Sequence, residues 1–198
     1  MVHRGKLFVF EGPDGVGKST LANWFLTHLR NSGQQAQLLS FPGKEPGSLG
    51  HHVYRLHHNP KAFGIDSLPH ASLQLLHVAA HIDAIENRIE PLLSGGSDIV
   101  LDRFWWSTFV YGLVGGVPPS VLNGMIALER SIWGPTLPDR LFLVTRSAPL
   151  RPEPPDKWPR WRDAYAQLAE EESNTYAVVK ISNEHAMAHA QELILENL

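Results

Sequence analysis

The sequence predicts an α/β domain built on a five-stranded parallel sheet flanked by helices. Short, almost continuously apolar segments alternate along the chain with segments in which apolar residues recur every three or four positions. Continuous apolar character is typical of parallel strands that are covered on both faces. The 198 residues are 43% hydrophobic, which is enough for one domain, residues 1–198, with a full core.

The predicted elements follow one another in a regular strand–helix order. The apolar segments predicted as strands are 6–10, 37–41, 98–101, 140–145 and 177–181. The first helix is indicated by Leu21, Phe25 and Leu29 at helical spacing, with Gly33 where a C-terminal glycine is common. The later helical patterns are 72–86, 105–114, 119–132, 160–172 and 184–197. This alternation is typical of a doubly wound fold.

Two regions interrupt this order: residues 42–70, which are rich in proline and glycine, and residues 146–160, which are rich in proline. Each follows a predicted strand, and in parallel sheets the loops at the carboxyl ends of the strands line the ligand crevice. Long irregular loops in a compact domain are usually functional or disordered. We therefore expect both regions to be loops that take part in ligand binding.

A phosphate-binding motif links the first predicted strand to the first predicted helix. Residues 12–19 read GPDGVGKS and match the pattern G-x-x-x-x-G-K-S. In such a loop the backbone N–H groups point at phosphate oxygens, the lysine reaches the outer phosphates and the serine hydroxyl holds Mg²⁺. The expected phosphate-binding residues are Gly12, Gly15, Val16, Gly17, Lys18, Ser19 and Thr20.

Composition excludes several other classes of protein. The sequence has no cysteine, which excludes disulfides, thiolate metal sites and cysteine nucleophiles. A net charge of -3 argues against a nucleic-acid-coating protein, which needs clustered cations. The apolar run Leu7–Phe10 is too short for a signal peptide or a membrane span, so we expect a soluble cytoplasmic protein with no membrane partner.

With these motifs in place, the sequence resembles the thymidylate kinase family of nucleoside monophosphate kinases over nearly its whole length. The family patterns are F-E-G-x-D/E-G-x-G-K-S/T, R-E-P-G, D-R-Y/H-x-x-S-x-x-A-Y-Q and a proline–aspartate step before the fourth strand. The matching residues are Phe10–Ser19, Lys44–Gly47, Asp102–Phe104, Ser107, Tyr111–Gly112 and Pro138–Asp139. The resemblance implies transfer of a phosphoryl group from ATP, with Mg²⁺, to a deoxynucleoside 5′-monophosphate.

The resemblance also implies roles for individual residues. On the donor side, Lys18 serves the phosphates, while Ser19 and Asp102 hold Mg²⁺. On the acceptor side, Arg103 and Lys44 bind the phosphate; Lys44 stands where relatives have an arginine and so lacks the bidentate fork. The remaining implied acceptor residues are Asp14 near the sugar and phosphate, Ser107, and Tyr111 beside the ribose 2′ position. A structural ion pair between Asp102 and Arg103 is the alternative.

The phosphate loop itself carries no arginine, since Val16 follows the second glycine. Relatives of this type supply transition-state arginines from the lid, which falls here in the short segment 146–162. That segment offers Arg151, Lys157, Arg160 and Arg162. We expect at least one of Arg151, Arg160 and Arg162 to act in catalysis, with Arg160 and Arg162 as the assigned candidates and a solvated basic loop as the alternative.

The predicted base pocket departs from the family pattern. His77 replaces the aromatic residue on which relatives stack thymine, His81 replaces an arginine one turn later, and Gly112 replaces the glutamine that reads the pyrimidine edge. Tyr111 is kept, so selection for deoxyribose is expected to be retained. We predict that thymidylate is a poor substrate, and that the acceptor KM varies between about pH 5.5 and 7.5 if the imidazoles read the base.

Other features leave alternatives open. Trp105 and Trp106 offer a new stacking surface, although at least one of them is expected in the core. The histidine pairs at 51–52 and 57–58 lack the carboxylates that would support a metal site. The acceptor is therefore thymidylate or an analogue, or alternatively a modified pyrimidine nucleotide, a nucleoside or a base in DNA. A third hypothesis is a nucleotide-binding regulator without turnover; the resemblance further implies a homodimer.

Overall fold

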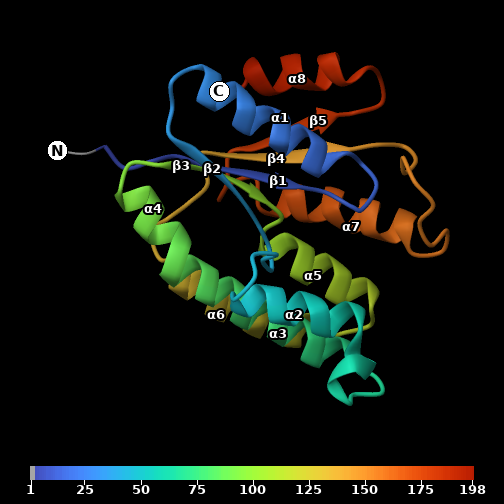
Figure 1. Cartoon of the computed structure of the whole chain (residues 1–198). Coiled ribbons are helices and arrows are strands. Elements are labelled where there is room, and N and C mark those ends of the chain that lie inside the picture. The colour runs from blue at the N-terminus through green and yellow to red at the C-terminus, as the bar shows by residue number, and fades with distance from the viewer. Residues whose placement is uncertain (1–2) are drawn as a thin grey trace.

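The centre of the molecule is a parallel sheet with the strand order β2-β3-β1-β4-β5. A computed structural model describes residues 3–198 (Figure 1). The strands are β1 Leu7–Glu11, β2 Ala36–Ser40, β3 Asp98–Asp102, β4 Arg140–Thr145 and β5 Val178–Ser182. All five predicted strands are confirmed, with bounds that differ by no more than one residue.

Helices cover both faces of this sheet. In Figure 1, α1 and α8 lie on one face and the remaining helices lie on the other. The helices and helical turns are α1 Lys18–Asn31, α2 Leu49–His58, η1 Pro60–Phe63, α3 His70–Ala84, η2 Ile85–Ile89, α4 Glu90–Ser94, α5 Trp105–Val114, α6 Pro119–Trp133, α7 Trp158–Glu171 and α8 Met187–Leu195. The predicted doubly wound fold is thereby confirmed.

Helix α1 shows how the sequence sets this arrangement. Leu21, Phe25 and Leu29 are buried against the sheet, as their spacing predicts. The helix begins after Gly17 and ends before Gly33, both at positive φ (93° and 82°). A side chain would be strained at these angles, so glycine fixes both ends of the helix.

The prediction that residues 42–70 form an irregular loop is wrong. The segment contains α2 and η1. Ser48 caps α2, because its Oγ accepts a hydrogen bond from the His51 N–H at 3.1 Å, and Val53 anchors the helix in the protein. The many prolines and glycines lie outside α2 or at its first turn. They made the whole segment look irregular, although it contains a helix of ten residues.

Two further boundaries also differ from the prediction. Helix α7 begins at Trp158, because Pro159 suits the first turn of a helix, so the irregular lid ends at Lys157. The helix predicted over 72–86 continues to Ser94 through the π-helical turn η2. Pro91 lies just after η2, in the first turn of α4, where its missing N–H is tolerated.

The carboxyl ends of the strands meet at one edge of the sheet. Asp102 pairs in register with Phe10 of β1 and with Ser40 of β2, so Glu11 and Asp102 lie at the same edge. The phosphate-binding loop, the lid and the segment before α2 all leave the sheet there. This edge is where a doubly wound fold places its ligand.

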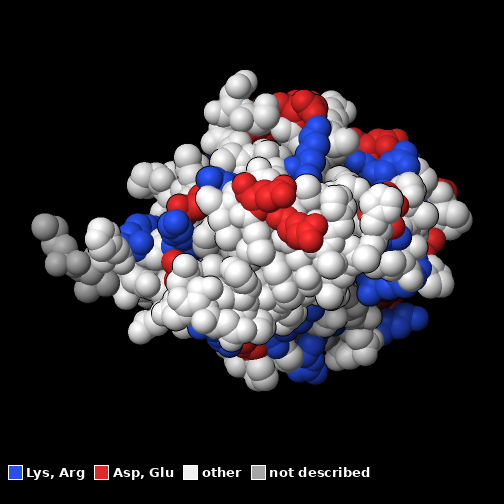
Figure 2. Space-filling view, turned by 90° about the horizontal axis from the view of Figure 1, so that it is seen from above, with Lys and Arg blue, Asp and Glu red and all other residues white. Residues whose placement is uncertain are grey.

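The surface gives two further observations. On the face seen in Figure 2, Lys and Arg side chains are interspersed with Asp, Glu and uncharged residues. Across residues 3–198, no helix has the length and apolar character needed to cross a membrane.

Candidate nucleotide-binding site

The phosphate-binding loop is held in shape by its glycines and by two neighbouring segments. Gly15 has a φ of 77°, its C=O accepts a hydrogen bond from the Leu150 N–H at 2.8 Å, and a Cβ there would lie 2.8 Å from Pro149 Cβ. On the other side, Asn183 Nδ2 donates to the Val16 carbonyl at 2.7 Å. The lid and the segment after β5 therefore pack directly on this loop.

Lys18 lies inside the loop and is only 5% exposed. Its Nζ donates to the Pro13 carbonyl at 2.7 Å and lies 4.0 Å from Asp14 Oδ1. Burial lowers the pKa of Lys18 to about 8, with the neighbouring Arg103 acting in the same direction. The ammonium is therefore poorly compensated by the protein and is available to an anionic phosphate.

Ser19 and Asp102 form the part of the site that suits a cation. Ser19 Oγ donates to Asp102 Oδ2 at 2.5 Å. Asp102 Oδ1 is buried and, within residues 3–198, has no hydrogen-bond partner. Mg²⁺ prefers oxygen ligands and takes few of them from the protein, keeping waters and substrate phosphates for the rest. The predicted pair therefore fits Mg²⁺, although the described residues contain no cluster of three or more His, Asp or Glu side chains that could hold a metal.

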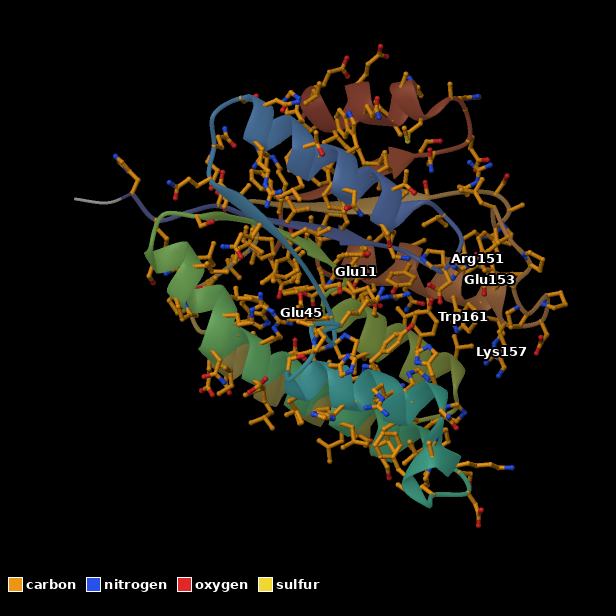
Figure 3. The ribbon with its side chains drawn as sticks, viewed as in Figure 1. Glu11, Glu45, Arg151, Glu153, Lys157 and Trp161 are labelled. Atoms are coloured by element: carbon orange, nitrogen blue, oxygen red, sulfur yellow. The ribbon has the colours of Figure 1, made fainter. Side chains whose placement is uncertain are left out.

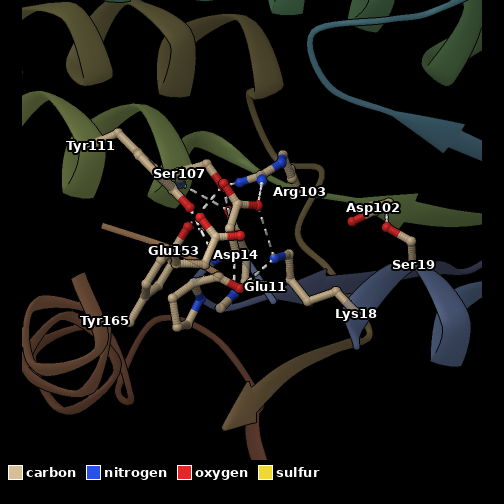
Figure 4. A network of polar contacts seen from close by, with 12 residues as sticks. Glu11, Asp14, Lys18, Ser19, Asp102, Arg103, Ser107, Tyr111, Glu153 and Tyr165 are labelled. Carbon is tan, nitrogen blue, oxygen red and sulfur yellow. Dashed lines mark hydrogen bonds and ion pairs between the residues drawn. The ribbon is translucent and has the colours of Figure 1, made fainter. Parts of the chain in front are cut away.

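Glu11 is the centre of a buried polar network at the end of β1 (Figure 4). Its Oε1 accepts hydrogen bonds from the backbone N–H groups of Phe104 (2.7 Å) and Ser107 (3.0 Å). Its Oε2 accepts from Ser107 Oγ (2.9 Å) and Tyr165 OH (3.1 Å). Burial raises the pKa of Glu11, while the charges of Arg103 and Lys18 oppose that shift.

The role of Glu11 was not predicted from the sequence. The available signal was its carboxylate, which ends an otherwise apolar buried strand and therefore needs hydrogen-bond partners. Tyr165, another member of the network, gave no signal, because it is one of several apolar positions on α7.

Arg103 is aimed into the site by its backbone and by its partners. It has a φ of 78°, which is uncommon outside glycine and is often found at functional positions. Its guanidinium forms an ion pair with Asp14, donates to Ser107 Oγ at 2.9 Å and lies over the Tyr111 ring at 5.4 Å. The alternative of an Asp102–Arg103 ion pair is wrong, because the partner of Arg103 in the described structure is Asp14.

Asp14 joins the phosphate-binding loop to the acceptor side. Burial would raise the pKa of Asp14, but the positive charges of Arg103 and Lys18 outweigh it and lower the pKa. The Asp14 N–H also donates to Tyr111 OH at 3.1 Å, and its carbonyl accepts from Trp158 Nε1 at 2.7 Å. Three separate segments thus fix this residue.

A cavity of about 560 Å³ opens beside Asp14, Ser19 and Asp102 and extends between α2, α3, α5 and the lid. All predicted acceptor residues line it: Asp14, Lys44, His77, His81, Arg103, Ser107 and Tyr111. The residues that the sequence analysis did not single out include Tyr54, Gln74, Thr108 and Trp161. Sequence reasoning therefore selected residues that the fold brings together, while their binding roles stay predictions.

The two histidines predicted in the base pocket have different surroundings. His81 is 2% exposed; its ring stacks on Phe41 with centroids 3.9 Å apart, and its Nδ1 lies 2.9 Å from Glu129 Oε2. His77 Nε2 lies 3.3 Å from His57 Nδ1. Burial lowers the pKa of His77 to about 2, so His77 is neutral at physiological pH. It cannot supply the expected titration between about pH 5.5 and 7.5.

The proposed stacking surface of Trp105 and Trp106 is wrong, because both side chains belong to the core, at 2% and 0% exposure. Trp105 Nε1 donates to Tyr176 OH at 3.2 Å, away from the cavity. The tryptophans at the site come instead from α7. Trp161 packs against Tyr111 with ring centroids 4.7 Å apart, and Trp158 binds the loop through Asp14.

The lid approaches the cavity through its middle (Figure 3). Arg151 Nε pairs with Glu153 Oε1 at 2.7 Å, and its Nη2 lies 3.9 Å from Asp14 Oδ1. Arg151 and Lys157 line the cavity, whereas Arg160 and Arg162 do not belong to its described lining. Arg160 and Arg162 lie on a regular helix rather than on the lid, because α7 begins before Arg160.

The fold and this site define a P-loop protein with the fold of nucleoside monophosphate kinases. The chain belongs to the thymidylate kinase family, since the model of that family, "Thymidylate kinase", matches residues 10–191.

Individual relatives agree with this assignment. A thymidylate kinase of Dinoroseobacter shibae is 34% identical over 144 residues, or 73% of this chain and 66% of the relative. One from Bradyrhizobium sp. strain BTAi1 is 36% identical over 145 residues, or 71% of this chain and 59% of the relative. The matched segments thus span less than two thirds of these relatives' own lengths. The crystal structure of thymidylate kinase from Ehrlichia chaffeensis shares the fold, with a TM-score of 0.76 at 21% identity over 98% of this chain and 97% of that one.

Proposed function

We propose that this protein is a thymidylate kinase, which transfers the γ-phosphoryl group of ATP to the phosphate of thymidylate. The observation that carries the proposal is that the groups expected to bind the donor phosphates and the groups expected to bind the acceptor phosphate line the same cavity. The phosphate-binding Lys18 and the Ser19–Asp102 pair lie at one end of a single cavity, and the Arg103–Asp14 pair lies beside them. Membership in the family supports thymidylate as the acceptor.

On the donor side, the backbone N–H groups of the loop and Lys18 bind the ATP phosphates. Ser19 Oγ and Asp102 would hold Mg²⁺, which supplies positive charge to the phosphate oxygens when bound. The backbone N–H of Thr20, at the start of α1, belongs to the same set of phosphate donors.

On the acceptor side, Arg103 is the main phosphate ligand. Its guanidinium is already oriented by Asp14 and by Ser107, so little ordering is needed when a phosphate binds. Lys44 lines the same cavity and adds a second charge. Tyr111 is fixed between the Asp14 N–H and Trp161, where it would restrict the sugar and exclude a ribose 2′-hydroxyl.

Phosphoryl transfer needs in-line positioning and charge stabilisation and little covalent chemistry from the protein. The side chains around the cavity supply both, and no observation favours a different acceptor or a regulator without turnover. The expectation that thymidylate is a poor substrate rested on replacements at three positions and did not consider the other residues of the cavity. The homodimer, the single domain 1–198 and a cytoplasmic location remain parts of this proposal.

The test is ADP release with ATP, Mg²⁺ and each ribo- and deoxynucleoside monophosphate and nucleoside in turn. Thymidylate is expected to give the highest kcat/KM. Ribothymidine 5′-monophosphate, which has ribose in place of deoxyribose, is expected to give a much lower value. The Lys18→Ala variant serves as the background control. A higher kcat/KM for a nucleoside or for another base would overturn the acceptor assignment. ATP binding without ADP release for any acceptor would indicate a regulator.

A further inference from the structure

Gln74 is a buried polar side chain whose function the fold does not explain. It lies on α3 one turn before His77 and is 5% exposed. It lines the cavity, and no hydrogen bond within residues 3–198 involves its carboxamide, whose N and O atoms are not among the fully buried polar atoms and so remain open to the cavity. Glutamine offers two N–H donors and an oxygen acceptor, and here these groups face the cavity without a protein partner. A partner supplied by a bound ligand would account for its retention.

The residue opposite Gln74 explains how this side chain fits. Gly112 lies on α5, which packs against α3. A Cβ on Gly112 would lie 3.0 Å from Gln74 Cγ and 2.6 Å from Leu122 Cδ2. Any larger side chain at position 112 would therefore compete with Gln74 for the same volume. The two positions can hold one long side chain between them.

This steric relation bears on the base pocket. The resemblance described above implies that relatives read the pyrimidine edge with a glutamine at the position of Gly112. In this chain that position has no side chain, and the Cγ of Gln74 from the facing helix lies where a side chain at position 112 would begin. A carboxamide is therefore available on α3 in a chain that lacks one at this position of α5.

We propose that Gln74 is the residue that recognises the base of the acceptor nucleotide. Its Oε1 accepts from the N3–H of thymine and its Nε2 donates to O4, so the carboxamide contacts both groups of the pyrimidine edge. The same face of α3 also presents His70 and His77 to the cavity. This inference rests on the proposed function, because it concerns the acceptor of that reaction.

The experiment compares two ligands across matched variants by calorimetric titration. The ligands are thymidylate and the 5-methylpyrimidin-2-one deoxyribonucleotide, which lacks both N3–H and O4 and carries only a hydrogen at C4. Wild type is expected to bind thymidylate at least about tenfold more tightly, since lost hydrogen bonds cost roughly 1–3 kcal/mol. In Gln74→Leu the two affinities should agree within about threefold, through weaker thymidylate binding. The acceptor KM should rise while kcat stays within about twofold.

Controls separate recognition from packing. Gln74→Met keeps the length of the side chain and should lose the same discrimination, which guards against a folding defect in the leucine variant. Leu75→Ala changes a half-exposed neighbour on α3 outside the cavity and should keep the tenfold ratio. Folding of each variant is checked by thermal melting.

The outcomes distinguish this inference from the proposed function. If both Gln74 variants keep the wild-type ratio, or lose affinity for both ligands equally, Gln74 has only a packing role and the inference fails. If wild type binds thymidylate but does not discriminate between the two ligands, the inference fails as well. If wild type neither binds nor phosphorylates thymidylate, the proposed function itself fails.

Discussion

The phosphate-binding end and the base-binding end of the cavity are built in different ways. At the phosphate end, nine consecutive residues, 12–20, supply the expected groups, mostly as backbone N–H donors positioned by glycines. At the base end, side chains come from α2, α3, α5 and the lid. A backbone site requires a fixed local sequence. A side-chain site requires only that a chemical group reach the right volume, so its residues can lie on different elements, as Gln74 and Gly112 illustrate.

The first prediction addresses the phosphate end, where the largest effect is expected. Lys18→Ala should lower kcat by about 10³-fold or more, because the ammonium meets charge that develops on the transferring phosphoryl group. Its folding should be little affected, since Lys18 pairs only with groups of its own loop. The measurement is steady-state ADP release, with thermal melting as the folding control. Near-normal turnover would contradict the assignment of the loop.

The second prediction concerns Arg103, which lies between the two ends. Arg103→Ala should lower kcat/KM for the acceptor about 30- to 1000-fold, which corresponds to a loss of roughly 2–4 kcal/mol of transition-state stabilisation. The ATP dissociation constant should stay within a few-fold of the wild-type value. Arg103→Gly is the matched control, because glycine adopts the φ of 78° without strain. Both variants should lose the same activity, while the Arg103→Gly variant should have a higher melting temperature than Arg103→Ala. An equal loss of ATP affinity would instead indicate a structural role.

The third prediction concerns the network that supports both ends. The Glu11 carboxylate only accepts hydrogen bonds, and the groups around it donate them. Glu11→Gln places an NH₂ donor among these donors, so the free energy of unfolding should fall by roughly 1–3 kcal/mol. The acceptor KM should rise, because Ser107 also orients Arg103. Urea unfolding and acceptor titration measure the two effects. An unchanged unfolding free energy would show that the network is not a stabilising one.

The comparison also explains which parts of the molecule could be predicted from the sequence. The strands and the phosphate-binding loop were predictable, because each depends on residues close together in the chain, such as the buried run Leu7–Glu11 and its glycines. Helix α2 was missed, because a capping serine and a single buried Val53 leave little periodicity in ten residues.

At the base end, the sequence analysis identified positions but not their surroundings. Spacing placed His77 and His81 correctly on α3, yet only the fold shows that Phe41 and Glu129 hold His81. Gln74 gave no signal, because one glutamine in an apolar helix resembles an ordinary surface residue. Burial and the contact with a glycine on another helix are tertiary properties that no local pattern contains.

The fourth prediction tests the lid. Arg151→Ala should lower kcat by about tenfold, because Arg151 lines the cavity 3.9 Å from Asp14, whereas Arg160→Ala and Arg162→Ala should stay within about twofold of wild type. All three side chains are exposed or half-exposed, so their replacement should not change stability appreciably. Single-turnover rates with saturating ATP give the comparison. A tenfold loss in Arg160→Ala, with Arg151→Ala unaffected, would restore the sequence-based expectation and require the lid to rearrange.

The smallest effect is expected from pH at the base end. His77 has a pKa lowered to about 2 by burial, so its charge does not change between about pH 5.5 and 7.5, and the His77 contribution to the acceptor KM should be flat there. Stability should nevertheless depend on this residue. The unfolded chain binds a proton at His77 below about pH 6.5 and the folded chain does not, so the free energy of unfolding falls as the pH drops below that value. His77→Gln should therefore make the fall shallower, by the contribution of one proton, without changing the pH profile of KM. Urea unfolding at pH 7.5 and 5.5, for wild type and variant, measures this difference. A KM profile that becomes flat only in the variant would show that His77 titrates and reads the base through its charge.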